Sequence, residues 1–359
     1  MTAPRVEIDL GKIRANARSL VRRLGARGVS VTGVTKAVCG HPEVARAMLD
    51  GGVFDLADAR IRNVLRMRTA GIGGPISMLR APMGGEMEDV IKYCDTSYNT
   101  EIDTILALAA AARAQGREHE VILMIEMGDL REGIPPESVD EIAALVVATP
   151  GVALKGIAAN FACLGDVAPT PDDMAMLSRL ADQVEGACGA FVTVVSGGGS
   201  ANLAWALGEG ATGRINTLRL GEAILLGVDP VTGFAIDGLH TDAFALFAEV
   251  IETGLKPGSM VAKNGRRLRS ILAVGRQDTD VNGLSFPSGA RLIGATSDHT
   301  VIDTTNFAAP LGSEMKMGLS YSALMRAMSA PDVTRAVFGK SSVDRVASGR
   351  TATPVLTVV

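Results

Sequence analysis

Short apolar runs and amphipathic segments alternate along the first two thirds of the chain. Each run ends in a turn and is followed by a stretch whose apolar residues have helical spacing. The runs predicted as strands are residues 29–36, 53–59, 74–81, 96–99, 120–128, 152–162 and 191–199, and residues 215–227 close the series. Strands that alternate with helices in this way form parallel sheets.

Eight such units between residues 29 and 227 predict a closed (β/α)8 TIM barrel, so the fold class is α/β. The rival architecture is an open, doubly wound sheet. It would place a glycine fingerprint after its first strand, and none follows residues 29–36. We therefore assign residues 11–232 to the barrel.

The pattern changes from about residue 233. Short strands separated by turn residues replace the alternation, for example in residues 243–253, 290–305 and 351–359. This predicts a separate, mostly β C-terminal domain over residues 233–359. Residues 1–10 contain the strand-like RVEIDL, which has no place in the barrel, and we expect this strand to pair with the second domain.

Composition and charge narrow the possible partners. The net charge of −4, without a basic run, argues against nucleic acid and anionic membranes. The start lacks the apolar core of a signal peptide, and no apolar run is long enough to span a membrane. Four scattered cysteines without a CxxC pair predict a reduced, cytoplasmic protein, and the scattered histidines give no metal site.

Candidate chemistry gathers where the predicted strands end. In barrels of this kind the active site lies at the carboxyl ends of the strands. Lys36, Asn160, Arg219 and the segment 196–200 fall at or near such ends, and Arg131 lies in the loop after the fifth strand. We expect one barrel mouth to collect a lysine, two arginines and a glycine-rich turn.

The glycine-rich turn SGGGS contains Ser196, Gly199 and Ser200 and precedes a helix. Glycines let backbone N–H groups approach a phosphate, and a helix start adds a favourable dipole. Gly221 and Glu222, after the eighth strand, would complete the phosphate site typical of such barrels. The alternative interpretation is a tight turn without a ligand.

Lys36 ends an apolar, β-branched strand, where a lysine is costly unless it is paired or reactive. It could pair with a carboxylate, bind a phosphate or form a Schiff base. A phosphate site in the same mouth favours a Schiff base to a phosphorylated aldehyde, of which pyridoxal 5'-phosphate is the common one.

Arg219 bears on the electronics of such a cofactor. Opposite the pyridine nitrogen, an arginine keeps that nitrogen unprotonated and the ring a weak electron sink. The Cα carbanion is then reprotonated and not diverted to transamination. The alternative is a surface arginine, which the apolar segment TLRLGEAILLG disfavours.

Seven segments resemble the fold-type III pyridoxal-phosphate enzymes of the alanine racemase-like group, with the ornithine racemase branch as the nearer match. They are EIDLGKIRAN, VTGVTKAVCG, MGDLREGI, SGGGSANL, LRLGEAILLG, AVGRQDTD and GATSDH, and they cover nearly the whole chain. The resemblance implies the cofactor pyridoxal 5'-phosphate, with Lys36 as both the Schiff-base lysine and the base on one face of the substrate Cα.

The same resemblance implies roles for other residues of the mouth. Arg219 would face the pyridine nitrogen, and Arg131 would orient the cofactor O3′ and the substrate carboxylate. Asn160 stands where alanine racemases carry a ring-stacking histidine. The phosphate contacts would come from Ser200, Gly221, Glu222 and, as a further candidate, Tyr321.

One departure from the family concerns the second base. Alanine racemases place a tyrosine there, in a segment that reaches into the partner's site, whereas this chain has Arg276 in GRQDTD. An arginine is a poor proton carrier because its pKa is too high. Nearby candidates are Asp278, Asp298 and His299, and each could equally be an ordinary residue of the β domain. Cys163 is another candidate, for which core filling is the simpler interpretation.

The leading hypothesis is a homodimeric amino-acid racemase in which the partner's C-terminal domain completes the active site. The missing tyrosine suggests a substrate other than alanine, and the ornithine-like branch suggests a basic one. Acidic residues near the mouth could receive a distal ammonium, namely Asp129, Glu132, Asp166 and Asp278. The alternatives are a decarboxylase of the same fold and a pyridoxal-phosphate carrier without turnover.

Overall fold

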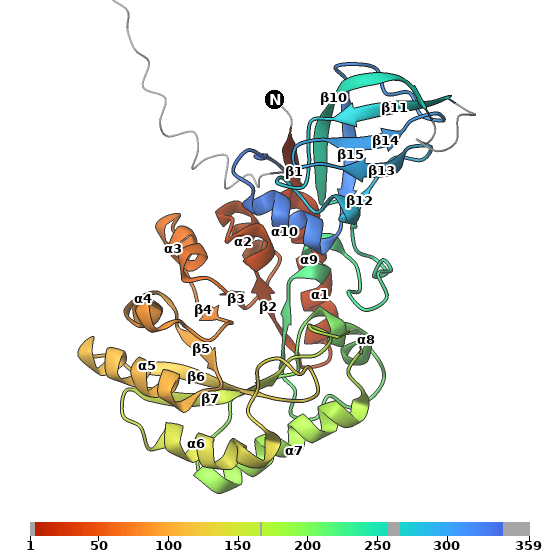
Figure 1. Ribbon diagram of the computed structural model, residues 1–359. Helices are drawn as coiled ribbons and strands as arrows, with labels where there is room; N and C mark the ends of the chain where they lie inside the picture. Colours follow the sequence, from red (N-terminus) through yellow and green to blue (C-terminus); the bar gives the residue numbers. More distant parts are fainter. Residues whose placement is uncertain (1–3, 166, 258–265, 340–359) are drawn as a thin grey trace, which may run out of the picture.

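The computed structural model describes residues 4–165, 167–257 and 266–339. Parallel strands β2 to β9 pair in chain order and close into a barrel (Figure 1). They are β2 Ser30–Val34, β3 Asp55–Asp58, β4 Ile76–Met78, β5 Thr96–Asn99, β6 His119–Ile125, β7 Val152–Ala159, β8 Val194–Ser196 and β9 Thr217–Leu220. The (β/α)8 barrel predicted from the alternation is confirmed.

Helices cover the outside of the barrel (Figure 1). They are α1 Leu10–Gly25, α2 Pro42–Asp50, α3 Ile61–Thr69, α4 Met87–Tyr93, α5 Ile102–Ala114, α6 Val139–Val147, α7 Pro171–Cys188, α8 Leu203–Ala206 and α9 Glu222–Leu226. Short 3-10 turns lie between them, namely η1 Lys36–Val38, η2 Gly84–Glu86, η3 Pro136–Ser138 and η4 Ser200–Asn202. Two of these turns, η1 and η4, directly follow barrel strands and carry candidate site residues.

The C-terminal part is a mostly antiparallel sheet, as predicted, in which β12, β15, β10, β11, β14 and β13 are neighbours in that order. Its elements are β10 Phe244–Pro257, β11 Arg266–Leu272, η5 Val281–Gly283, β12 Leu284–Ser285, β13 Arg291–Ala295, β14 Thr300–Asp303, β15 Glu314–Leu319, α10 Tyr321–Ser329 and β16 Thr334–Phe338. The strand expected at residues 351–359 lies outside the described residues.

The start of the chain belongs to this second sheet. Strand β1, Arg5–Asp9, pairs antiparallel with β10 and parallel with β16. Arg5 ties the strands together, because its guanidinium contacts Glu314 at 2.5 Å and Glu7 at 2.8 Å and lies 4.5 Å from the centre of the Phe247 ring. The chain thus begins in one domain and enters the other through α1.

Helix α10 connects the two domains. Figure 1 shows it beside α2 and α9, between the barrel and the sheet, and it packs against the turn η1 that carries Lys36. Buried Asn16 on α1 adds a polar link, since its amide donates to the carbonyls of Ile224 at 3.1 Å and His240 at 2.8 Å. The C-terminal domain therefore reaches the mouth of the barrel in the same chain.

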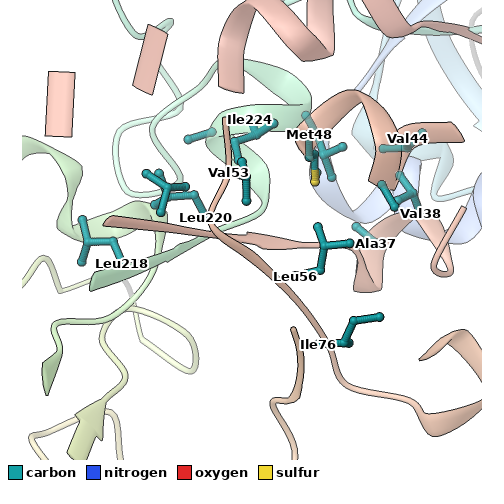
Figure 2. Packing of buried hydrophobic residues seen from close by; sticks show 14 of the residues in the cluster. Ala37, Val38, Val44, Met48, Val53, Leu56, Ile76, Leu218, Leu220 and Ile224 are labelled. Carbon is teal, nitrogen blue, oxygen red and sulfur yellow. The ribbon is translucent and has the colours of Figure 1, made fainter. Parts of the chain in front are cut away.

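The apolar core runs directly beneath the first candidate residue. Ala37 and Val38 follow Lys36 and are each 1% exposed. They belong to the cluster drawn in Figure 2, together with Met48 of α2 and Leu56 of β3. Their burial fixes the turn after β2, so the position of Lys36 is set by packing on both neighbouring elements.

No helix among the described residues is long and apolar enough to cross a membrane. Within the same residues, no group of three or more His, Cys, Asp or Glu side chains could hold a metal ion.

Candidate active site

Lys36 lies two residues beyond the end of β2, at the carboxyl-end mouth of the barrel. Its side chain keeps an exposed surface there, although protein surrounds most of it. This desolvation lowers the pKa of Lys36, and the positive charges of Arg131 and Arg219 lower it further, while Cys163 and Asp58 act in the opposite direction. A lowered pKa increases the share of neutral amine, which is the nucleophilic form.

The glycine-rich turn after β8 and the start of α9 lie together. The Ser200 hydroxyl accepts a hydrogen bond from the Ala223 amide at 3.2 Å. Gly198 has a φ of +119°, and a Cβ there would lie 2.2 Å from Oδ1 of Asn202. A Cβ on Gly221 would lie 3.3 Å from Cβ of Val34, the last residue of β2. The first loop therefore needs glycine at position 198, and the second packs at Gly221 close to the strand that leads to Lys36.

Arg219 is held inside the barrel by three hydrogen bonds. It donates to the Ser196 hydroxyl at 2.5 Å, to the Ala159 carbonyl at 2.7 Å and to Oδ1 of Asn160 at 2.8 Å. Its guanidinium also lies 5.2 Å from the centre of the Tyr98 ring. The arginine is 6% exposed, so its orientation is fixed and it is not a surface residue.

A polar chain links Arg219 to Arg131. The Asn160 amide donates to Oε1 of Glu132 at 2.9 Å, and Arg131 donates to the same oxygen at 2.9 Å. Arg131 also lies 3.5 Å from Oδ2 of buried Asp129. Glu132 thus places one negative charge between the two arginines of the mouth.

Glu222 and Tyr321 lie on the C-terminal side of the mouth. Burial raises the pKa of Glu222 to about 7, with a further increase from Asp229 and an opposing effect of Lys36. Burial also raises the pKa of Tyr321, and Glu222 and Asp58 add to that increase. The two side chains are thus within electrostatic reach of each other, although α9 and α10 are distant in sequence.

Cys163 does not fill the core, so that interpretation of the sequence is wrong. It is exposed in the loop after β7, where its backbone amide donates to Oδ1 of Asp129 at 2.8 Å. Buried Asp129 therefore holds the backbone of this loop. Burial of part of the side chain raises the pKa of the thiol, while Arg131 and Lys36 lower it.

Backbone strain is concentrated at this mouth. Among the described residues, those other than glycine with a positive φ are Cys39 at 54°, Leu130 at 52° and Ala162 at 52°. Cys39 ends the turn of Lys36, Leu130 precedes Arg131, and Ala162 precedes Cys163. Such conformations cost free energy and persist where the surrounding structure imposes them, most often at functional sites.

The second-base candidates lie elsewhere, on two loops of the C-terminal sheet. Nδ1 of His299 lies 2.8 Å from Oδ1 of Asp298, and this hydrogen bond lowers the pKa of Asp298. Buried Asp278 accepts from the Gly275 amide at 2.8 Å, and burial raises its pKa.

The two loops are joined by backbone bonds from Arg276 to Thr296 at 2.9 Å and from Gln277 to Ser297 at 3.0 Å. Within the parts of the chain that the structure describes, no hydrogen bond or ion pair connects these candidates to Lys36.

Reasoning from the sequence missed Asp58 and Thr35. Asp58 is the last residue of β3 and is 0% exposed, and Thr35 precedes Lys36 and is also 0% exposed. Their positions in the sequence could have indicated a role, because both lie near the carboxyl ends of predicted strands, as Lys36 does. Asp166, named above as a possible acceptor for an ammonium group, lies outside the described residues.

Comparison with known proteins agrees with this geometry. The family model for the alanine racemase N-terminal domain matches residues 8–230. The chain is 36% identical to a lysine racemase of Thermotoga maritima, over 93% of this chain and 98% of that protein. It is 31% identical to an ornithine racemase of Acetoanaerobium sticklandii, over 90% of this chain and 96% of that protein.

Among solved structures, alanine racemase from a D-cycloserine-producing Streptomyces lavendulae superposes with a TM-score of 0.76 at 22% identity, over 96% of this chain and 99% of that one. The similarity shows that the barrel and the C-terminal sheet together form one known fold. The match of the family model to most of the barrel, joined to two full-length relatives above 30% identity, shows that this chain belongs to the alanine racemase family.

Proposed function

We propose that this protein is a pyridoxal-phosphate-dependent racemase of a basic amino acid. The observation that carries the proposal is the position of Lys36 in one barrel mouth with a fixed arginine, Arg219, and a paired glycine-rich turn. The names of the two full-length relatives, a lysine and an ornithine racemase, support the basic substrate.

The residues of the mouth fit the cofactor. The turn at Gly198 leaves no room for a Cβ, and Gly221 lies close to Val34, as is typical of loops that bring backbone N–H groups to a phosphate. Ser200, Gly199, Gly221 and Glu222 would hold that phosphate, with Tyr321 beside Glu222. Ser196 would act through Arg219, since its hydroxyl accepts from that guanidinium. When bound, the cofactor would supply the electron sink that acidifies the substrate Cα–H bond.

Lys36 would take the Cα proton on one face and return it. Its pKa is lowered by burial, so a larger share of the amine is in the neutral form that can accept a proton. Arg219 would not supply a proton to the ring nitrogen, because a guanidinium keeps its protons in proteins and three acceptors hold this one in place. Arg131, oriented by Glu132, would bind the substrate carboxylate.

The opposite face needs a second acid–base group, which we propose comes from a partner subunit. In one chain the Asp298–His299 pair is on the C-terminal sheet without a contact to Lys36 among the described residues. A histidine hydrogen-bonded to a carboxylate is a suitable proton carrier at neutral pH. Asp278 is less suitable because it is buried and already accepts from its own turn. The protein would then act as a homodimer.

The distal ammonium group of the substrate would bind to the carboxylate of Glu132. Asp129 is buried and accepts from the backbone amides of Cys163 and Leu164, and Asp278 is buried in its turn. Glu132 keeps 39% of its side chain exposed at the mouth, with its charge between Arg131 and Asn160. It is therefore the best placed of the three described carboxylates.

The test is chemical trapping. The protein with added pyridoxal phosphate is reduced with borohydride and digested, and the peptide containing Lys36 is weighed by mass spectrometry. We expect the cofactor mass on Lys36, no such mass in Lys36→Ala, and an unchanged result in the exposed-residue control Lys92→Ala. Wild-type protein that carries no cofactor mass on Lys36 would refute the proposed function.

A further inference from the structure

Asp58 is a fully buried carboxylate at the end of β3. Its Oδ2 accepts from the Thr35 hydroxyl at 2.7 Å, and its Oδ1 accepts from the Asn63 amide at 2.9 Å and the Arg60 backbone amide at 3.0 Å. All three partners donate, and an ionised carboxylate is the form that accepts only. Burial raises the pKa of Asp58, and these three bonds oppose that increase because they favour the charged form.

The bonds of Asp58 belong to a clamp around the turn of Lys36. On one side, the Thr35 hydroxyl donates to one carboxylate oxygen of Asp58. The other oxygen of Asp58 accepts from the side-chain amide of Asn63 on α3. From the other side, a Cβ on Gly40 would lie 2.7 Å from the Asn63 carbonyl, so the turn rests on α3. Contacts thus hold the turn at Thr35 and at Gly40, and Lys36 lies between these two residues.

Several charges face Lys36 from the surrounding elements. Arg131 and Arg219 disfavour its ammonium form, while Cys163 and Asp58 favour it. Glu222 and Tyr321 lie on the remaining side. Lys36 opposes the increase in the pKa of Glu222, and Asp58 adds to the increase in the pKa of Tyr321. Among the described residues, no lysine, arginine or histidine forms an ion pair with Asp58.

We propose that Asp58 is a positioning residue for Lys36: through Thr35 and Asn63 it holds the turn that carries the lysine. The negative charge of Asp58 also opposes the effect of Arg131 and Arg219 on the lysine amine. The inference rests on the proposed function, in which Lys36 takes and returns a proton. Without Asp58, two arginines and burial would act on the amine with less opposition, and Lys36 would be a weaker base.

The experiment measures the protonation of Lys36 in protein freed of cofactor. Acetic anhydride labels amines in proportion to their neutral form, so labelling at a series of pH values, read by peptide mass spectrometry, gives the midpoint for Lys36. Asp58→Asn keeps the shape of the side chain at position 58 and removes its negative charge. We expect the Lys36 midpoint of this variant to fall below that of the wild type, because the charge of Asp58 favours the ammonium form.

A second variant, Thr35→Val, keeps the negative charge of Asp58 and removes the hydrogen bond between Thr35 and Asp58. We expect hydrogen exchange of the amides of residues 36–40 to become at least about tenfold faster, because a hydrogen bond to a charged group is lost. Asp173→Asn, which removes a carboxylate from the capping box of α7, is the matched control and should change neither measurement.

Either of two results would overturn the inference. One is an unchanged Lys36 midpoint in Asp58→Asn with native circular dichroism, and the other is unchanged exchange in Thr35→Val. In both cases Asp58 would only cap the start of α3. Because these readings need no cofactor, they are independent of the trapping experiment, whose failure would instead remove the proposed function.

Discussion

Nη2 of Arg219 donates to Oδ1 of Asn160 at 2.8 Å, and the amide of the same asparagine donates to Glu132 at 2.9 Å. One neutral side chain therefore aligns the arginine in the barrel with the carboxylate that holds Arg131. Asn160 is therefore a link between the two cationic groups of the mouth.

Asn160→Ala should break this link. It removes one of the three acceptors of buried Arg219 and one of the two donors to Oε1 of Glu132, so we expect the free energy of unfolding to fall by about 1–3 kcal/mol. The racemisation kcat should fall with it, because Arg131 and Arg219 lose their alignment. Urea unfolding and polarimetry measure the two effects. Asn282→Ala, in an exposed turn, is the control, and equal effects of both variants would contradict the role of Asn160.

Glu132→Gln should change substrate preference. If Glu132 receives a distal ammonium, KM for lysine or ornithine should rise by about tenfold, in line with the loss of one charged hydrogen bond. KM for alanine should not rise, since alanine has no distal charge. Steady-state kinetics with the three substrates provide the comparison, with Glu118→Gln at the opposite end of β6 as control. A uniform rise for all three substrates would show that Glu132 acts only on Arg131.

Ala162→Gly should raise the free energy of unfolding and at the same time lower kcat. Glycine adopts a positive φ without the strain that alanine has at 52°, so the free energy of unfolding should rise by up to about 1 kcal/mol. The looser loop should lower kcat. Ala110→Gly, on the exposed face of α5, should instead lower stability by about 1 kcal/mol. A loss of stability in both variants would mean that Ala162 is not strained.

Glu222→Gln should change the pH dependence of stability. The pKa of Glu222 rises from its ordinary value of 4.5 to about 7 on folding, so the native state binds more protons between these values. Stability from this group is therefore present at pH 4.5 and is lost as the pH rises to 7. Relative to wild type, Glu222→Gln should gain stability from pH 5 to pH 8 in urea unfolding. An equal difference at both pH values would contradict the raised pKa.

Much of the fold was predictable because the barrel repeats one pattern. Helix α1 was not assigned from the sequence, although its buried residues Leu10, Ile13, Ala17, Leu20 and Leu24 have helical spacing. The long strand β10 was also underestimated, because it changes partners along its length, from β1 and β15 to β11.

The candidate site was predictable where position along a strand decides it. Lys36 and Arg219 follow from strand ends, and the structure brings Arg131, Asn160 and Ser200 to the same mouth. Side chains that act through others left no such signal, since the bond from Thr35 to Asp58 joins residues 23 positions apart and depends on the register of β2 and β3. The second base could not be assigned because, among the residues that the structure describes, no hydrogen bond or ion pair joins its candidates to Lys36.

The central claim is racemisation of a basic amino acid at Lys36. Its most direct test is incubation of the protein, with pyridoxal phosphate, in D2O with L-lysine, L-ornithine or L-alanine separately, followed by chiral chromatography with mass detection. We predict that lysine or ornithine becomes racemic with deuterium at Cα, that alanine reacts more slowly, and that Lys36→Ala is inactive. Release of CO2, a preference for alanine, or no deuterium in any of the three amino acids would contradict the account.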